Sequence, residues 1–320
     1  MGKENKMIKH FMYVPWTGLG LYNGFRGNRW LKNRIKIFKQ FVVPSLQAQT
    51  NKNFTLWCSW RAEERRNPYV QELVTYLNSI KEFKTVHTFH GICFYDDKYS
   101  KEEARKRLVM SIHGSIAELL DEIGESLFVY MTIQPSDDCY SKNAVAGIQG
   151  VFSRSPGLQA FGFTKGYIMN YLDKSIAEYN PNTNPPFYTI KFPREAFVDP
   201  LKHLDYTALK KDVPPYEKGT PLPSHEYVKD CLKYGTADIR GFLVGTHSEN
   251  ISTTFVHPFK GADVGKEVLE EFGLENVERL KIKVSLKKWL MRRLPHKVQR
   301  KLRYIFGEKI WQKWYDFIRS

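Results

Sequence analysis

The sequence predicts an α/β protein with a doubly wound, mostly parallel sheet. Apolar runs rich in β-branched and aromatic residues alternate with stretches of helical periodicity over the first ~135 residues. This is the order expected of parallel strands joined by helical crossovers. The run at 127–133 then ends in Pro135 and two adjacent carboxylates, Asp137 and Asp138. Polar residues at the carboxyl end of a buried parallel strand lie where open α/β sheets bind their ligands.

The individual elements follow from local patterns. Leu31, Ile35, Phe38 and Val42 are apolar at helical spacing, and Pro44 is expected to interrupt or restart that helix. Strands are predicted at 8–14, 54–58, 86–94, 127–133, 159–170, 187–192 and 242–251, and helices from about residue 30, from Pro68, over about 100–120, and after Ser141 and Ser224.

Length and composition are those of a globular protein. With 320 residues, 42% of them hydrophobic, the chain is long enough for one large α/β domain with appendages, or for two domains. Every apolar run is shorter than the ~18 residues of a membrane-spanning helix, and residues 1–6 lack the hydrophobic core of a signal peptide. The 4 cysteines show neither metal-ligand spacing nor the density of a disulfide framework, which favours the reducing cytoplasm.

The net charge of +15 is concentrated at the carboxyl end. Residues 279–320 contain 14 Lys or Arg against Glu308 and Asp316, a net charge of +12, so the rest of the chain carries only +3. The sequence therefore predicts a nearly neutral domain that carries a strongly basic tail. The division is placed at 1–258 for the domain and 259–320 for the basic helical extension.

The basic extension is also amphipathic. Its apolar residues, including Trp289, Trp311 and Trp314, recur mostly at three- and four-residue steps, and Lys and Arg fill much of the other face. A basic, Trp-bearing amphipathic helix is typical of attachment to an anionic membrane surface. Packing against the preceding domain would explain the apolar stripe but not the charge density. Nucleic-acid binding would explain the charge, but it is disfavoured because no reader motif accompanies it.

The adjacent Asp137 and Asp138 predict a cation site. Neighbouring carboxylates repel each other unless positive charge lies beside them. A hard divalent cation, Mn²⁺ or Mg²⁺, prefers oxygen ligands and leaves positions open for phosphates. The alternative is an Asp-rich turn that caps the helix expected after Ser141. The Asp-Asp dipeptide by itself does not decide between the two.

Three stretches of the chain resemble one family of enzymes. In 34–57, Pro-Ser-Leu stands at the end of a helix and a Phe opens the next strand. In 132–140 a strand ends in carboxylates, and 245–252 contains a His and an Asn. These stretches resemble the GT-A glycosyltransferases, in particular those described as rhamnosyltransferases, and the resemblance covers roughly residues 8–255.

The resemblance implies a GT-A-like sheet and transfer of a sugar from a nucleotide-sugar donor. The sequence departs from the family pattern at Ile133 and Pro135, which stand where the family has an Arg and the first Asp of its Asp-x-Asp motif. In that fold the first Asp helps to hold the ribose of the nucleotide and the last Asp binds metal. The resemblance therefore supports metal binding more directly than nucleotide recognition.

The resemblance also assigns residues to the site. Asp138, with Asp137 directly or through water, and His247 are expected to hold Mn²⁺ or Mg²⁺ and to leave places for two phosphate oxygens. Ser136, Asp137 and Arg34 are expected on the donor side. The alternatives are a solvated helix face for Arg34 and an ordinary strand-end histidine for His247.

An inverting transfer needs a carboxylate base for the acceptor hydroxyl. Glu226, at the start of a predicted helix after a Pro-rich loop, is the candidate, and Asp199 and Asp205 are its rivals. A Glu in the first turn of a helix is also favoured simply by the helix dipole, so the alternative for Glu226 is a structural role.

Together these features predict a metal-dependent, inverting glycosyltransferase. It would move a sugar from a nucleotide-sugar donor to a polysaccharide or glycolipid acceptor, as a peripheral protein at the cytoplasmic face of a membrane. The alternative from another class is a non-catalytic nucleic-acid-binding protein with a basic tail. Metal-dependent binding of a nucleotide sugar would distinguish the two.

Overall fold

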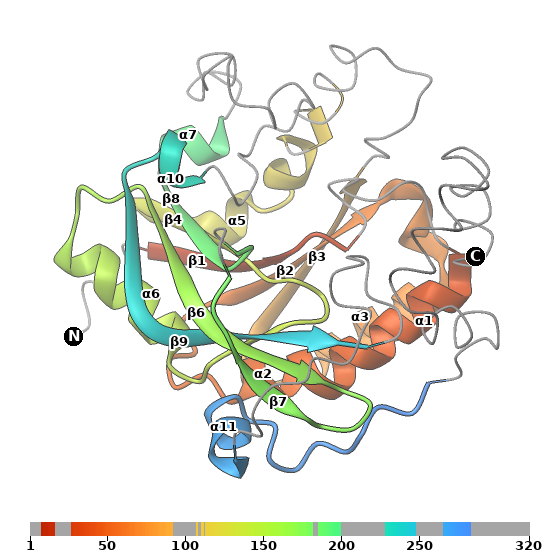
Figure 1. Cartoon of the computed structure of the whole chain (residues 1–320). Helices are drawn as coiled ribbons and strands as arrows, with labels where there is room; N and C mark the ends of the chain where they lie inside the picture. Colours follow the sequence, from red (N-terminus) through yellow and green to blue (C-terminus); the bar gives the residue numbers. More distant parts are fainter. Residues whose placement is uncertain are drawn as a thin grey trace, which may run out of the picture.

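A curved nine-stranded sheet forms the centre of the computed structural model, in the order β3-β2-β1-β4-β8-β6-β9-β5 with β7 paired to β6 (Figure 1). The structure describes residues 8–16, 27–91, 107, 110–111, 113–181, 185–199, 228–247 and 265–282. The strands are β1 Ile8–Val14, β2 Thr55–Arg61, β3 Lys84–Gly91, β4 Phe128–Ile133, β5 Cys139–Tyr140, β6 Ala160–Asn170, β7 Ile176–Tyr179, β8 Tyr188–Pro193 and β9 Tyr234–Thr246.

Most of the sheet runs in one direction. β1 pairs in parallel with β2 and β4, and β2 pairs in parallel with β3. β8 lies antiparallel between β4 and β6, and β9 pairs in parallel with β6. The strands β1 to β4, β6 and β9 therefore point the same way, whereas β5, β7 and β8 oppose them. The predicted α/β class with a mostly parallel sheet is confirmed, and the carboxyl ends of β4 and β9 lie at the same edge.

Helices cover both faces of the sheet. Because side chains alternate along a strand, Met12 and Val14 of β1 pack with α1, α3 and α6, whereas Phe11 and Tyr13 pack with α5, α7 and α10. Figure 1 shows α7 and α10 on the opposite side of the sheet from α1 to α3. The helices are α1 Gly27–Ile37, a π-helical turn Phe38–Val42, α2 Val43–Gln47, a 3₁₀ turn Ala62–Arg66, α3 Pro68–Asn78, α5 Leu120–Ile123, α6 Ala144–Arg154, α7 Arg194–Val198, α10 Val228–Cys231 and α11 Lys266–Glu271.

Pro44 does not break the first helix. The chain remains helical from α1 through the π-helical turn into α2, and Pro44 lies at the beginning of α2. The amide of Val43 bonds to the carbonyl of Phe38, five residues back, which is the wider bonding of a π turn. The missing N–H of Pro44 then falls at a helix start, where it is tolerated. The predicted interruption is therefore a change of helix type.

Residues 265–282 pack against the sheet, although the sequence places them in the basic extension. Phe272, Leu274 and Leu280 are buried in one cluster with residues of the π turn and β6. The amide of Leu280 donates to the carbonyl of Tyr171 at 2.8 Å. The described part of the predicted extension thus contributes to the core. Residues 283–320, which hold most of its basic charge, lie outside the described residues.

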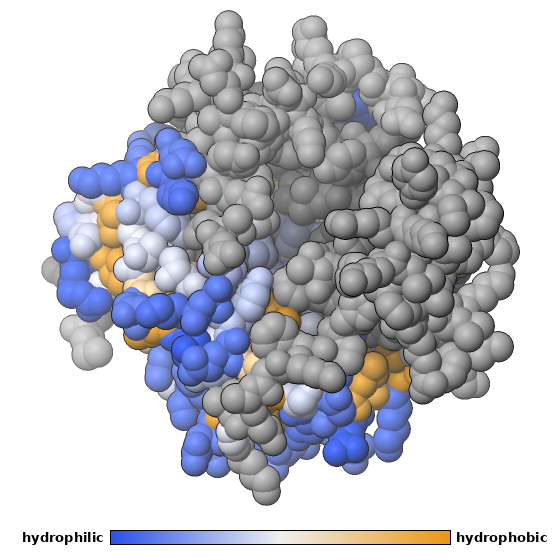
Figure 2. Space-filling model, viewed as in Figure 1, coloured by the Kyte–Doolittle hydropathy of each residue, from blue (hydrophilic) through white to orange (hydrophobic). Residues whose placement is uncertain are grey.

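The surface of the described residues is mainly polar on the side shown in Figure 2, where apolar residues form small separate patches. Most of the large apolar side chains of these residues lie instead in three buried clusters. Among the described helices, none has both the length and the apolar character needed to cross a bilayer.

If residues 265–282 belong to the core, Phe272→Ala should destabilise the whole domain. Phe272 is fully buried, and truncation of a buried Phe lowers the free energy of unfolding by about 3–5 kcal/mol. Chemical denaturation should show this loss, while Glu270→Ala, an exposed change in the same segment, should stay within about 0.5 kcal/mol of wild type. Equal unfolding energies for the two variants would show that the segment is not part of the core.

Candidate active site

Four charged or titratable side chains meet at the carboxyl edge of the sheet. Arg34 comes from α1, Asp137 and Asp138 follow β4, and His247 follows β9. They meet because β4 and β9 point the same way and α1 lies beside their carboxyl ends. This is the edge at which open α/β sheets bind ligands.

Asp137 is held between two cationic or hydrogen-bonding groups. Its Oδ2 atom forms an ion pair with Nη1 of Arg34 and lies 3.0 Å from Nε2 of His247. Burial by itself would raise the pKa of Asp137, but the Arg34 guanidinium and His247 outweigh it and hold that pKa well below its usual range. Asp137 is therefore a carboxylate whose charge is already compensated inside the protein.

Asp138 has the opposite environment. Its Oδ1 atom accepts a hydrogen bond of 2.9 Å from the amide of Gly245. Burial and the neighbouring charge of Asp137 raise the pKa of Asp138 well above its usual range, and the Gly245 amide and the more distant Arg34 only partly oppose them. The two adjacent carboxylates therefore differ: Asp137 has counter-charges, whereas a negative charge on Asp138 is poorly compensated and disfavoured.

An aromatic stack orients His247. The ring of Tyr171 stacks on His247 with centroids 6.2 Å apart and on Phe41 with centroids 3.7 Å apart. The Tyr171 hydroxyl also donates to the carbonyl oxygen of Asp137 at 2.9 Å. Tyr171 thus fixes both His247 and the backbone of the acidic turn.

Two further residues shape the acidic turn, and sequence reasoning missed them. Gln134 is fully buried, and its side-chain amide nitrogen donates to the carbonyl oxygens of Pro135 and Asp138, each at 2.8 Å. A side chain at Gly245 would place its Cβ 2.3 Å from the carbonyl oxygen of Asp137, so only glycine fits between the two strand ends. The polar Gln134 at the end of an apolar run was the one sequence signal of such a role.

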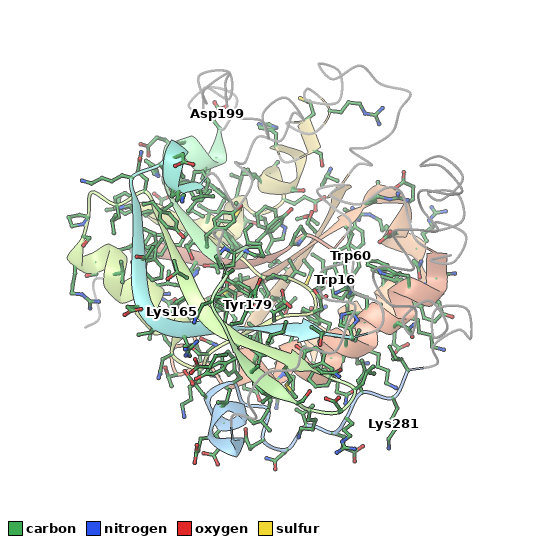
Figure 3. All side chains as sticks on the ribbon, in the orientation of Figure 1. Trp16, Trp60, Lys165, Tyr179, Asp199 and Lys281 are labelled. Atoms are coloured by element: carbon green, nitrogen blue, oxygen red, sulfur yellow. The ribbon has the colours of Figure 1, made fainter. Side chains whose placement is uncertain are left out.

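The other predicted site residues are not all part of this cluster. Ser136 lies half-buried in the same turn as the two carboxylates. Glu226 and Asp205 lie outside the described residues. Asp199 follows helix α7. At the start of α7, the backbone amide of Arg194 donates to the carbonyl of Leu127, which precedes the first residue of β4. The helix therefore begins beside the amino end of β4, whereas the acidic turn follows its carboxyl end. Figure 3 shows Asp199 far from Trp16 and Trp60, which lie near the carboxyl ends of β1 and β2.

The cluster fits a divalent cation only in part. Within the described ranges, no group of three or more His, Cys, Asp and Glu side chains could hold a metal ion. Asp137 and His247 are joined to each other, which leaves Asp138 as the carboxylate that needs a positive charge. Mg²⁺ and similar ions are often held by one or two carboxylates together with water and substrate phosphates. The residues therefore fit a cation that brings most of its ligands with it.

Comparison with known families supports the resemblance seen in the sequence. The family model described as "Putative rhamnosyl transferase" matches residues 25–91, from just before α1 to the end of β3. The predicted family resemblance is confirmed. The match includes Arg34 and the segment around Pro44 and spans about a fifth of the chain.

Solved structures with a similar arrangement are distant. Residues 1–349 of S. aureus TarS are 12% identical, with 97% of this chain and 90% of that chain covered and a TM-score of 0.38. TarS in a second structure is 12% identical, with 98% and 54% covered and a TM-score of 0.35. A putative nucleotide-diphospho-sugar transferase from Desulfovibrio desulfuricans G20 is 11% identical, with 72% and 79% covered and a TM-score of 0.33. No curated protein sequence matches the chain.

The two carboxylates should respond oppositely to removal of their charge. Asp137→Asn leaves the buried Arg34 without its partner and should lower the free energy of unfolding by about 3–5 kcal/mol in metal-free buffer at neutral pH. Asp138→Asn keeps an oxygen for the Gly245 amide and removes a repelled charge, so its stability should equal or exceed that of wild type. Denaturation with urea measures both, and equal destabilisation by the two changes would contradict the assignment.

The pH dependence of stability should separate the same two groups. The lowered pKa of Asp137 stabilises the fold above the unfolded carboxyl pKa of about 4, and this contribution is lost as the pH falls below it. The raised pKa of Asp138 has the opposite sign, so wild type should lose stability as the pH rises from about 4. The advantage of Asp138→Asn over wild type should therefore be largest at neutral pH and vanish in acid. An advantage that does not depend on pH would exclude titration of Asp138 as its cause.

Proposed function

We propose that this protein transfers a sugar from a nucleotide-sugar donor to a polysaccharide or glycolipid acceptor at the cytoplasmic face of a membrane, with inversion, and that Mn²⁺ or Mg²⁺ assists the transfer. The observation that carries the proposal is the buried carboxylate of Asp138. It lies at the ligand-binding edge of the sheet, next to a second carboxylate, with a raised pKa and without a full counter-charge. Such a group is suited to receive a cation together with a diphosphate.

The chemistry of the transfer explains why a cation belongs there. Cleavage of a nucleotide sugar builds negative charge on the departing diphosphate, and a divalent ion supplies the positive charge that stabilises it. The carboxylate of Asp138, which the backbone amide of Gly245 orients, would hold that ion. Asp137 orients His247, and Tyr171 packs beneath both, so that the edge is rigid before the donor arrives.

The base for the acceptor hydroxyl is assigned to Glu226. An inverting transfer needs a carboxylate opposite the leaving group. Of its rivals, Asp199 follows a helix that begins beside the amino end of β4, whereas Asp138 follows the carboxyl end of that strand. Glu226 therefore remains the preferred candidate, with Asp205 as its rival.

Attachment to the membrane is assigned to residues 283–320. They contribute most of the excess positive charge of the chain together with three Trp residues. Each Lys or Arg near an anionic surface contributes at most about 1 kcal/mol, and insertion of apolar side chains adds to it. A tail of this composition would bring the enzyme to a lipid-linked or membrane-bound acceptor.

Asp138→Asn should strongly slow transfer without unfolding the protein. Loss of the carboxylate that holds the cation should lower turnover by about 10²–10³-fold, the usual effect of losing one electrostatic contact to a developing charge. The measurement is release of nucleoside diphosphate across a panel of nucleotide sugars with Mn²⁺ or Mg²⁺. Asp121→Asn, an exposed carboxylate on α5, is the matched control and should keep full activity. Wild-type turnover that is indifferent to EDTA would remove the metal from the mechanism.

A chain that ends after Ile282 should separate catalysis from membrane binding. It keeps Leu280 and its hydrogen bond to Tyr171, so it should fold like wild type and act on a short water-soluble acceptor. It should lose binding to anionic liposomes and activity on a lipid-linked acceptor, and added salt should weaken liposome binding of the full chain. If the full chain ignores anionic vesicles but binds duplex nucleic acid with steep salt dependence, the membrane assignment is wrong.

A further inference from the structure

Arg34 is a buried cation that forms an ion pair with one carboxylate, Asp137, among the described residues. Its side chain is 1% exposed, and its guanidinium lies over the ring of Trp30 at 5.4 Å. Its Nη1 atom pairs with Asp137, while Nε and Nη2 have no hydrogen-bond partner within the part of the chain that the structure describes. The guanidinium lies directly against Oδ2 of Asp137, so the charge of this carboxylate is compensated within the fold.

The oxygen of Asp137 that pairs with Arg34 is also within hydrogen-bond distance of His247. Both Nη1 of Arg34 and Nε2 of His247 meet Oδ2 of Asp137. A divalent cation on Asp137 would have to approach within a few ångströms of the guanidinium, against charge repulsion in a partly dry site. To bind His247 through Nε2, it would have to break the contact between the imidazole and Asp137.

We propose that Arg34 is a specificity-determining residue that acts as a fixed internal counter-ion. It withholds Asp137 and His247 from metal coordination and leaves Asp138 as the carboxylate for the cation among the described residues of this cluster. The described residues thereby favour a cation that arrives with the diphosphate of the donor, because a single carboxylate holds a free divalent ion only weakly. This inference rests on the proposed function in taking a divalent cation and the diphosphate of a nucleotide-sugar donor as the ligands.

The inference predicts that removal of Arg34 creates a better metal site. In Arg34→Met, Asp137 loses its counter-charge and is free to join Asp138 on a cation. Mn²⁺ alone, measured by electron paramagnetic resonance or calorimetry on the full chain without nucleotide, should bind wild type weakly and Arg34→Met at least about tenfold more tightly. Mn²⁺ should also raise the melting temperature of Arg34→Met more than that of wild type, because the ion replaces the missing positive charge.

Matched variants identify the cause of the gain. Arg34→Lys keeps a positive charge near Asp137 and should bind Mn²⁺ as weakly as wild type. Adding Asp137→Asn to Arg34→Met should abolish the gain. An Arg34→Met protein that folds but binds Mn²⁺ no better than wild type would overturn the inference, as would a gain that survives loss of Asp137.

Two variants test the inference even if Arg34→Met does not fold. His247→Gln keeps an N–H group that can hydrogen-bond to Asp137. With the nucleotide sugar bound, the affinity of this variant for Mn²⁺ should stay within about twofold of that of wild type. Asp138→Asn should abolish Mn²⁺ binding. A tenfold loss in His247→Gln, or retained binding in Asp138→Asn, would show that Arg34 does not restrict the site as proposed. These experiments measure Mn²⁺ binding and do not require turnover. If the transfer assay alone fails, the result counts against the proposed function and leaves the role of Arg34 unaffected.

Discussion

The buried ion pair between Arg34 and Asp137 is the interaction on which the site depends. It joins helix α1 to the turn after β4, two parts of the chain that lie far apart in sequence. Removal of either partner leaves an uncompensated charge, on the buried Arg34 or on the largely buried Asp137, which is less favourable than losing an exposed pair. The same carboxylate also contacts His247, which follows β9. The side chain of Asp137 therefore fixes the relative positions of α1, the turn after β4 and the end of β9.

A second constraint comes from the aromatic stack of Phe41, Tyr171 and His247. Tyr171 hydrogen-bonds to the acidic turn through its hydroxyl and to Leu280 through its carbonyl. The stack therefore connects the π-helical turn, the candidate site and the segment 265–282. A site held from several sides by packed elements is pre-organised, so the donor need not assemble it.

Much of the fold could be predicted from local patterns. β1 and the start of α3 were predicted correctly because alternation, helical spacing and an Asn-Pro start are written in neighbouring residues. β9 begins earlier than predicted, since pairing along β6 extends it through polar residues that no local pattern marks as a strand. The role of 265–282 was also missed, because whether residues such as Phe272 and Leu280 pack on the preceding domain depends on surfaces that distant segments form.

The sequence by itself determined the α/β class, the acidic pair at a strand end and the family resemblance, because each depends on residues close together in the chain. Only the tertiary structure decided how the two carboxylates differ. Asp137 and Asp138 are chemically identical neighbours, and their environments diverge through Arg34, His247 and Gly245, which arrive from α1 and β9. A pKa depends on the distances between charges and on burial. Those quantities exist only once the distant segments have been brought to the same edge of the sheet.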